Sequence, residues 1–162
     1  MSITLHGSAF RGRNEVGDFA WMIEQPDYDD VLFVFNDNEE QLRAFLFDSE
    51  HGSGCSRGGG NAVIRPFRCV DPPRAAGVPT GTLAGGGYPA LTASARRAIA
   101  DAMGVIDGLL ATGRYRRIFY SAAPDGSLGT GIFTVGDEVR AHIVEELRRR
   151  ASGGGEGGPV AP

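Results

Sequence analysis

The stretch DVLFVFN at residues 30–36 decides the fold class, because it is a short apolar run bounded by polar residues. A run of β-branched, aromatic and leucine side chains of this length predicts a strand that is buried on both faces, as in a parallel sheet covered by helices. The segment RIFYS at residues 117–121 predicts a second buried strand. Residues 2–6 are a candidate edge strand.

Helical periodicity marks two further segments. Residues 94–112 carry apolar side chains at intervals of 4, 3 and 4, which makes one helical face, and Ser94 is the expected N-cap. Residues 137–150 also form one apolar helical face, through Val139, Ile143 and Leu147, with Asp137 as the expected N-cap and two Glu–Arg pairs at i,i+4. Residues 41–47 are a candidate helix, and the loop-rich stretch 51–89 receives no assignment. The alternation of helix, strand and glycine loop in the last third predicts the α/β class.

Length and composition predict a single domain over residues 1–151, followed by a flexible glycine-rich tail at 152–162. The chain has 162 residues, of which 41% are hydrophobic, and this excludes a long disordered protein. No run approaches the roughly 20 apolar residues that span a bilayer, so we expect no membrane partner. Two cysteines are too few for a disulfide scaffold, and we expect both thiols to be free in a reducing, cytoplasmic compartment.

The charged residues narrow the choice of partners. Sixteen basic residues stand against 20 acidic ones, for a net charge of −4, which argues against nucleic-acid binding by bulk charge. Every basic residue is an arginine, which together with 25 glycines indicates GC-rich coding and a bacterial source. Without lysine there is no Schiff-base nucleophile, and any phosphate contact falls to arginine or to the backbone.

Three loops carry the candidate chemistry. The first strand ends in Asn36-Asp37-Asn38, and the second runs into DGSLGTGIF at 125–133 before the last helix. Ligands of open α/β sheets bind outside the carboxyl ends of strands, and glycine loops can offer backbone N–H groups to a diphosphate. The alternative is that Asp125-Gly126 forms a simple turn and that the other glycines of the loop bind no ligand. The third loop, RGGGNAVIR at 57–65, fits either close approach of a ligand or a flexible surface loop.

In this order, the three loops resemble the macrodomain family over most of residues 15–150. The match is closest at LGTGIF (128–133) and moderate at residues 58–65. The resemblance implies a three-layer α/β/α sandwich with a mixed, largely parallel central sheet that binds ADP-ribose. Several branches of the family hydrolyse ADP-ribose from proteins or from acetylated ADP-ribose.

The resemblance also implies roles for individual residues. Gly129, Thr130, Gly131 and Ile132 resemble the loop that binds the diphosphate, and Ser127 and Leu128 are expected to bind ligand with it. Phe133 and Asn38 are similar to residues that face the distal ribose, while Gly58, Gly59 and Gly60 resemble a second catalytic loop. Asp18, within Gly17-Asp18-Phe19, is similar to the aspartate that binds adenine, although Gly7-Ser8 competes for that place.

Departures from the family pattern shape the expected mechanism. Asn61 stands where hydrolytic members often carry an aspartate, and an asparagine can hold a water molecule but cannot take its proton. The resemblance implies a hydrolase of ADP-ribose linked by an ester to an acidic side chain or a small acyl group, in which Asn38 and Asn61 would orient water. The substrate's phosphate would take the proton, with Asp37 as the alternative base.

Two other interpretations remain at this point: a module that binds ADP-ribose without chemistry, and a small α/β domain without such a site. The expected partner is ADP-ribose or an ADP-ribosylated protein, and the protein is expected to act as a monomer without a cofactor. The spacing of His51 and Cys55 resembles a metal-ligand pair, but no second pair completes a four-ligand set, so we expect no metal.

Overall fold

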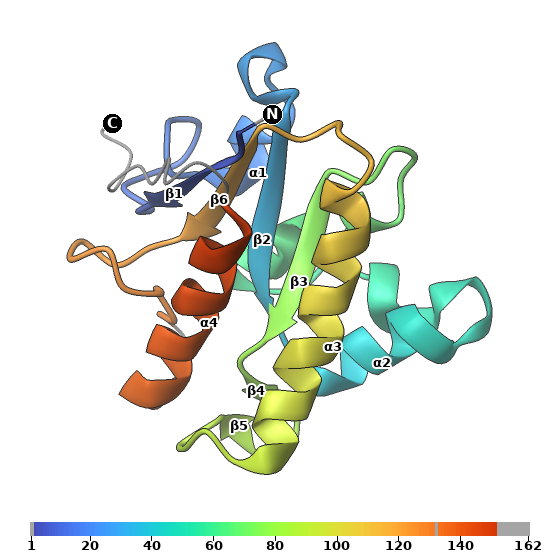
Figure 1. Cartoon of the computed structure of the whole chain (residues 1–162), viewed down its shortest axis with the longest axis vertical. Coiled ribbons are helices and arrows are strands. Elements are labelled where there is room, and N and C mark those ends of the chain that lie inside the picture. The colour runs from blue at the N-terminus through green and yellow to red at the C-terminus, as the bar shows by residue number, and fades with distance from the viewer. Residues whose placement is uncertain (1, 132, 152–162) are drawn as a thin grey trace.

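Four parallel strands form the centre of the fold in a computed structural model that describes residues 2–131 and 133–151 (Figure 1). Their order is β1 (Thr4–Ser8), β6 (Arg117–Ser121), β2 (Val31–Asp37) and β3 (Ala75–Pro79). In the centre of the sheet Val34 pairs with Tyr120 on one side and with Ala76 on the other. Both predicted buried strands are confirmed, and the predicted edge strand is β1, shifted by two residues.

Side chains of β2 alternate between two apolar clusters, which explains its continuous apolar run. Leu32 and Val34 pack with α3 (Ala93–Leu110) and α4 (Asp137–Arg150), which lie in front of the sheet in Figure 1. Val31, Phe33 and Phe35 pack on the other face with α1 (Phe19–Met22) and the 3₁₀ segment η3 (Gly60–Arg68). The fold is therefore an α/β sandwich with apolar packing on both faces of the sheet.

The central sheet differs from the expectation of a mixed sheet, because the four strands within the described ranges all pair in parallel. The antiparallel pair β4 (Gly81–Thr82) and β5 (Gly86–Gly87) is a separate two-stranded hairpin. Parallel pairing needs a crossover between strands, and the helices provide these connections.

Helix boundaries agree with the predictions to within one or two residues, but the caps differ. Thr92, not Ser94, caps α3 and accepts a hydrogen bond from the N–H of Ala95 at 3.1 Å. Gly136 is the N-cap of α4, so Asp137 lies in the first turn. There its negative carboxylate interacts favourably with the positive end of the helix dipole. The candidate helix at 41–47 is α2 (Glu39–Phe47).

The stretch that received no assignment holds β3, the hairpin, η3 and a second 3₁₀ segment, η2 (Ser49–Cys55). Another 3₁₀ turn, η1 (Pro26–Tyr28), precedes β2. Cys55 and Cys69 form a disulfide with their Cα atoms 5.9 Å apart, so the expectation of free thiols is wrong. The fold brings the end of η2 against the end of η3, and this removes the basis on which a reducing compartment was predicted.

Every helix within the described ranges falls short of the length and apolar character that a bilayer-crossing segment needs. The predicted glycine-rich tail at 152–162 lies outside the described residues.

Candidate functional site

A cleft of about 950 Å³ opens at the carboxyl edge of the central sheet. Its walls include the residues at or just beyond the ends of all four strands: Ala9 after β1, Asn36–Asn38 around the end of β2, Thr80 after β3 and Ser121–Pro124 from the end of β6 onward. Because the strands are parallel, their carboxyl ends meet at one edge, where open α/β sheets bind ligands. We call this feature the cleft.

Most of the predicted site residues lie on the cleft, although they come from distant parts of the chain. The predicted residues among its lining are Asp18, Asp37, Asn38, Gly58, Gly59, Gly60, Asn61, Gly129, Thr130, Gly131 and Phe133. Ile132 lies outside the described residues. The two glycine-rich loops that the sequence singled out therefore share one cavity.

Ser127 and Leu128 are not among the residues that line the cleft, and their expected part in ligand binding stays a prediction. Leu128 is buried in the core and bridges to Ala122. The Ser127 hydroxyl donates to the carboxylate of Asp125 at 2.6 Å, and this bond, with a second one from the Ser127 N–H, lowers the pKa of Asp125. These contacts fix the turn that precedes the Gly129–Gly131 loop.

Asn36 connects the two glycine-rich loops, and sequence reasoning did not select it as a site residue. Its Nδ2 donates to the carbonyl of Gly129 at 2.7 Å. Its backbone N–H donates to Oδ1 of Asn61 at 3.0 Å. Asn36 lies directly before Asp37 and Asn38 on β2, so the signal was its place in the same polar run. Through these two hydrogen bonds, Asn36 at the end of β2 holds the two loops beside each other.

Asn38 and Asn61 both line the cleft, and each uses its side-chain oxygen in a hydrogen bond within the chain. Oδ1 of Asn38 caps α2 by accepting from the N–H of Gln41 at 2.9 Å, and Oδ1 of Asn61 accepts from Asn36. Neither Nδ2 group has a hydrogen-bond partner within residues 2–131 and 133–151. Both side chains therefore offer donors to a ligand, suited to hydroxyl, carbonyl or phosphate oxygens.

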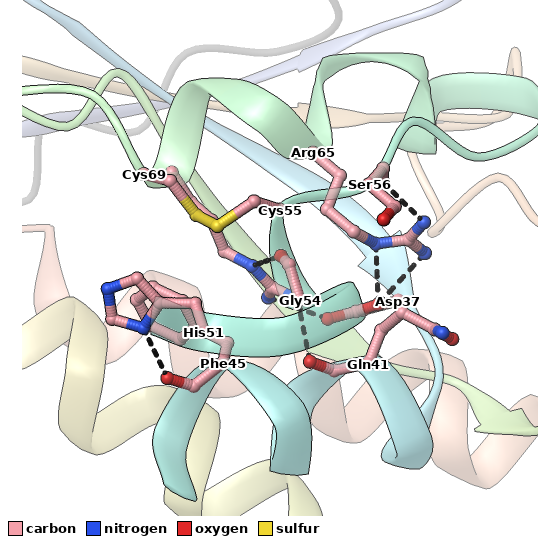
Figure 2. Close-up of a disulfide and its surroundings, with 10 residues drawn as sticks. Asp37, Gln41, Phe45, His51, Gly54, Cys55, Ser56, Arg65 and Cys69 are labelled. Carbon is pink, nitrogen blue, oxygen red and sulfur yellow. Dashed lines mark hydrogen bonds and ion pairs between the residues drawn. A yellow bond between two sulfur atoms is a disulfide. The ribbon is translucent and has the colours of Figure 1, made fainter. Parts of the chain in front are cut away.

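Asp37 lies in a buried ion cluster with Arg65 and Arg68 (Figure 2). Its Oδ1 accepts from Nε and Nη2 of Arg65 at 3.2 and 3.0 Å, and its Oδ2 accepts from Nη1 of Arg68 at 2.7 Å. The Asp37 side chain is 0% exposed. A Cβ on Gly77 of β3 would lie 2.6 Å from Oδ2 of Asp37, so the cluster requires a glycine there. We call these three charged residues the Asp37 cluster.

The bonds of the Asp37 cluster limit what Asp37 can do chemically. Both carboxylate oxygens already accept charge-assisted hydrogen bonds, and Oδ1 also accepts from the N–H of Asn38 at 2.9 Å. A general base needs a lone pair within reach of the proton that it abstracts. The geometry therefore favours a structural role for Asp37, which orients the start of α2 and the chain on either side of Gly58.

The charged residues that line the described part of the cleft are balanced, with Arg57 and Arg65 against Asp18 and Asp37, while Arg68 lies behind the wall in the Asp37 cluster. The Asp37 cluster joins two arginines to one aspartate, so its formal charge is +1. Arg57, an exposed residue on the cleft wall, has no ion-pair or hydrogen-bond partner in the part of the chain that the structure describes. Sequence reasoning did not select Arg57, although its place directly before Gly58–Gly60 was the available signal. An anion in the cleft would meet an unpaired guanidinium.

The rim of the cleft carries three large apolar side chains. Phe10, Leu83 and Phe133 are 63%, 65% and 57% exposed, and all three line the cleft. Leu83 belongs to the turn of the β4–β5 hairpin, where its N–H donates to a carboxylate oxygen of Glu40 at 2.9 Å. Exposed aromatic rings beside a polar cavity suit the flat faces of a sugar or a base.

Acidic and metal-binding groups are scarce at the cleft. Within the described ranges the acidic residues that line it are Asp18 and Asp37, and Asp18 accepts from the N–H of Asn14 at 2.8 Å. No group of three or more His, Cys, Asp or Glu residues in the described part of the chain could hold a metal ion.

Comparison with protein-family models, with curated proteins and with solved structures found no match for this chain.

Proposed function

We propose that this chain binds ADP-ribose in the cleft and hydrolyses ester-linked ADP-ribose there. One observation carries the proposal: the Gly58–Gly60 and Gly129–Gly131 loops, which resemble two loops of the macrodomain family, line a single cavity at the carboxyl edge of a parallel sheet. The volume of about 950 Å³ lies within the usual range for small-molecule sites, roughly 300–1,000 Å³. The proposed ligand combines a diphosphate with two sugars and a base.

The diphosphate is proposed to lie against the Gly129–Gly131 loop. The N–H of Gly129 is already engaged with the carbonyl of Ser121 at 2.9 Å, so the donors would come from the residues that follow it. Arg57 would supply the countercharge that a lysine often provides at phosphate sites. Phe133 would then pack against the distal ribose, and Asp18 would accept a hydrogen bond from the adenine amino group.

Hydrolysis would take place at the distal ribose. A water molecule would attack the anomeric carbon, the ester C–O bond would break, and the carboxylate would leave. A phosphate oxygen of the substrate would accept the proton of the water and pass it to solvent. The Nδ2 groups of Asn38 and Asn61 would donate to the water or to ribose hydroxyls, while Asp37 would hold the backbone around Asn38 in place.

A module that only binds ADP-ribose is the second candidate function, and one observation favours it. Asp37, the acidic side chain next to Asn38, has both carboxylate oxygens engaged and is not free to take a proton from water, while Asp18 is proposed to bind the adenine end of the ligand. This alternative keeps the same ligand and the same contacts, and it differs in the absence of turnover.

Two measurements test these proposals. Titration calorimetry with ADP-ribose, and with ADP as the control that lacks the distal ribose, should give the tighter binding for ADP-ribose. Incubation with a protein that carries ADP-ribose on a glutamate should then release free ADP-ribose. Binding without release would support the non-catalytic module, and failure to bind ADP-ribose would refute both candidates.

A further inference from the structure

The Cys55–Cys69 disulfide closes the segment that supplies one wall of the cleft. Arg57, Gly58–Gly60 and Asn61 lie on the cleft within this closed segment, as does Arg65 of the Asp37 cluster. A crosslink at the two ends of a loop limits the conformations of every residue between them. The disulfide therefore constrains two of the residues that are proposed to contact the ligand, Arg57 at the diphosphate and Asn61 at the distal ribose.

Each cysteine is a chain neighbour of a residue that contacts the Asp37 cluster or belongs to it. The carbonyl of Gly54, directly before Cys55, accepts from Nε of Arg68 at 2.6 Å. The carbonyl of Ser56, directly after Cys55, accepts from Nη1 of Arg65 at 3.0 Å. Figure 2 shows the disulfide beside these carbonyls, and Cys69 directly follows Arg68. The two crosslinked ends are thus tied to the cluster both by the sulfurs and by hydrogen bonds.

The two ends of the closed segment are held unequally. On the Cys69 side, Ile64 is fully buried in the core and Arg68 is bound within the Asp37 cluster. On the Cys55 side, most residues from 49 to 60 are exposed, and the chain follows irregular backbone through η2. We therefore expect loss of the crosslink to loosen residues 49–60, which would keep only the hydrogen bonds of Gly54 and Ser56 to the Asp37 cluster and other local contacts, while the rest of η3 stays packed on the sheet.

We propose that Cys55–Cys69 is a redox-controlled site whose reduction weakens ligand binding in the cleft. Both cysteines are partly exposed, so a dithiol can reach the bond. One thiolate of the dithiol attacks one sulfur, and the other sulfur leaves as a thiolate that takes a proton. The second thiolate of the dithiol then displaces the remaining sulfur, so two electrons pass and the dithiol becomes a cyclic disulfide. The link to affinity rests on the proposed function, whereas the change in loop mobility does not.

The first experiment compares the oxidised protein with protein reduced by dithiothreitol, using calorimetry with ADP-ribose. We expect the Kd to rise roughly tenfold on reduction, which corresponds to ordering about one further backbone residue on binding. Oxidised glutathione should restore the original Kd. The double variant Cys55→Ser with Cys69→Ser should bind like the reduced protein and should not respond to either reagent. An equal Kd in both redox states would overturn the link to binding.

Hydrogen exchange without ligand separates this proposal from the proposed function. Reduction should accelerate exchange at residues 49–60 and leave β2 and α3 unchanged, whether or not ADP-ribose is the ligand. Failure of the oxidised protein to bind ADP-ribose would then refute the proposed function alone. Unchanged exchange at 49–60, or loss of the whole fold on reduction as seen by circular dichroism, would refute the redox-controlled site.

Discussion

Replacing Gly131 by glutamate introduces a negative charge at the place proposed for the diphosphate. Gly131 lines the cleft, and nothing lies within 4 Å of the position that its Cβ would occupy. The new side chain therefore meets open space, and the backbone there does not need the left-handed conformation that favours glycine. We expect the fold to be unaffected and the change to act on the ligand.

The size of the effect follows from Coulomb's law. At about 6 Å from a diphosphate with two negative charges, the carboxylate repels it by about 1.4 kcal/mol at the dielectric constant of water, and by twice that at half the constant. Since each 1.4 kcal/mol is tenfold in affinity, the Kd for ADP-ribose should rise roughly 10- to 100-fold. Added salt should reduce the difference, because both charges are solvent-exposed.

Calorimetry at low and high salt measures this change, and Gly104→Glu is the matched control. Gly104 is an exposed residue of α3 that also has open space around the position of a Cβ, and it does not line the cleft. Both variants make the same change in net charge. If Gly131→Glu binds ADP-ribose as tightly as Gly104→Glu does, the diphosphate does not lie at this loop and the reasoning is refuted.

Three further variants test the rest of the site. Asp37→Asn leaves two buried guanidinium groups without a countercharge and should lower the free energy of unfolding by about 3 kcal/mol, measured by urea denaturation; a variant as stable as the parent would contradict the role of the Asp37 cluster. Arg57→Ala should raise the Kd for ADP-ribose roughly tenfold at low salt. The control Arg97→Ala, on the exposed face of α3, should leave this Kd unchanged. Equal Kd values for the two variants would show that Arg57 does not contact the ligand. Asn38→Ser keeps an N-cap oxygen but removes the Nδ2 donor, so stability should hold while turnover of an ADP-ribosyl ester falls roughly 10- to 1000-fold; full activity would exclude Asn38 from orienting water.

Local patterns were sufficient to predict the central strands and the long helices. The apolar run of β2 has a single physical explanation, burial on both faces, and the periodicity of α3 and α4 is visible without any tertiary information. The strand β3, with sequence AAGVP, carries no such pattern. Its small residues reflect what lies against it, because Gly77 is required by the charged groups of Asp37 and Arg68.

The candidate site, like the fold, could be predicted from the sequence only in part. Glycine-rich loops after strands indicated where a ligand could approach, and the topology brings the loops at 58–60 and 129–131 to one cleft. The disulfide and the contacts of Asp37 depend on contacts between residues distant in the chain, such as Asp37 with Arg65 and Arg68. No spacing rule within a single sequence identifies such partners. The sequence therefore led us to predict Asp37 as a candidate base and the two cysteines as free thiols.

The position of β6 between β1 and β2 has a consequence for how the chain folds during synthesis. Thr4 pairs with Arg117, so β1 has no partner in the sheet until nearly the whole domain has been translated. At about 5–20 residues per second, roughly 6 to 23 s pass between the synthesis of Thr4 and that of Arg117. From the synthesis of β3 until that of β6, the apolar β2 presents one unpaired edge to other nascent chains, which is a hazard for aggregation. Ribosomes that stall between β3 and β6 should therefore release a fragment that depends on chaperones.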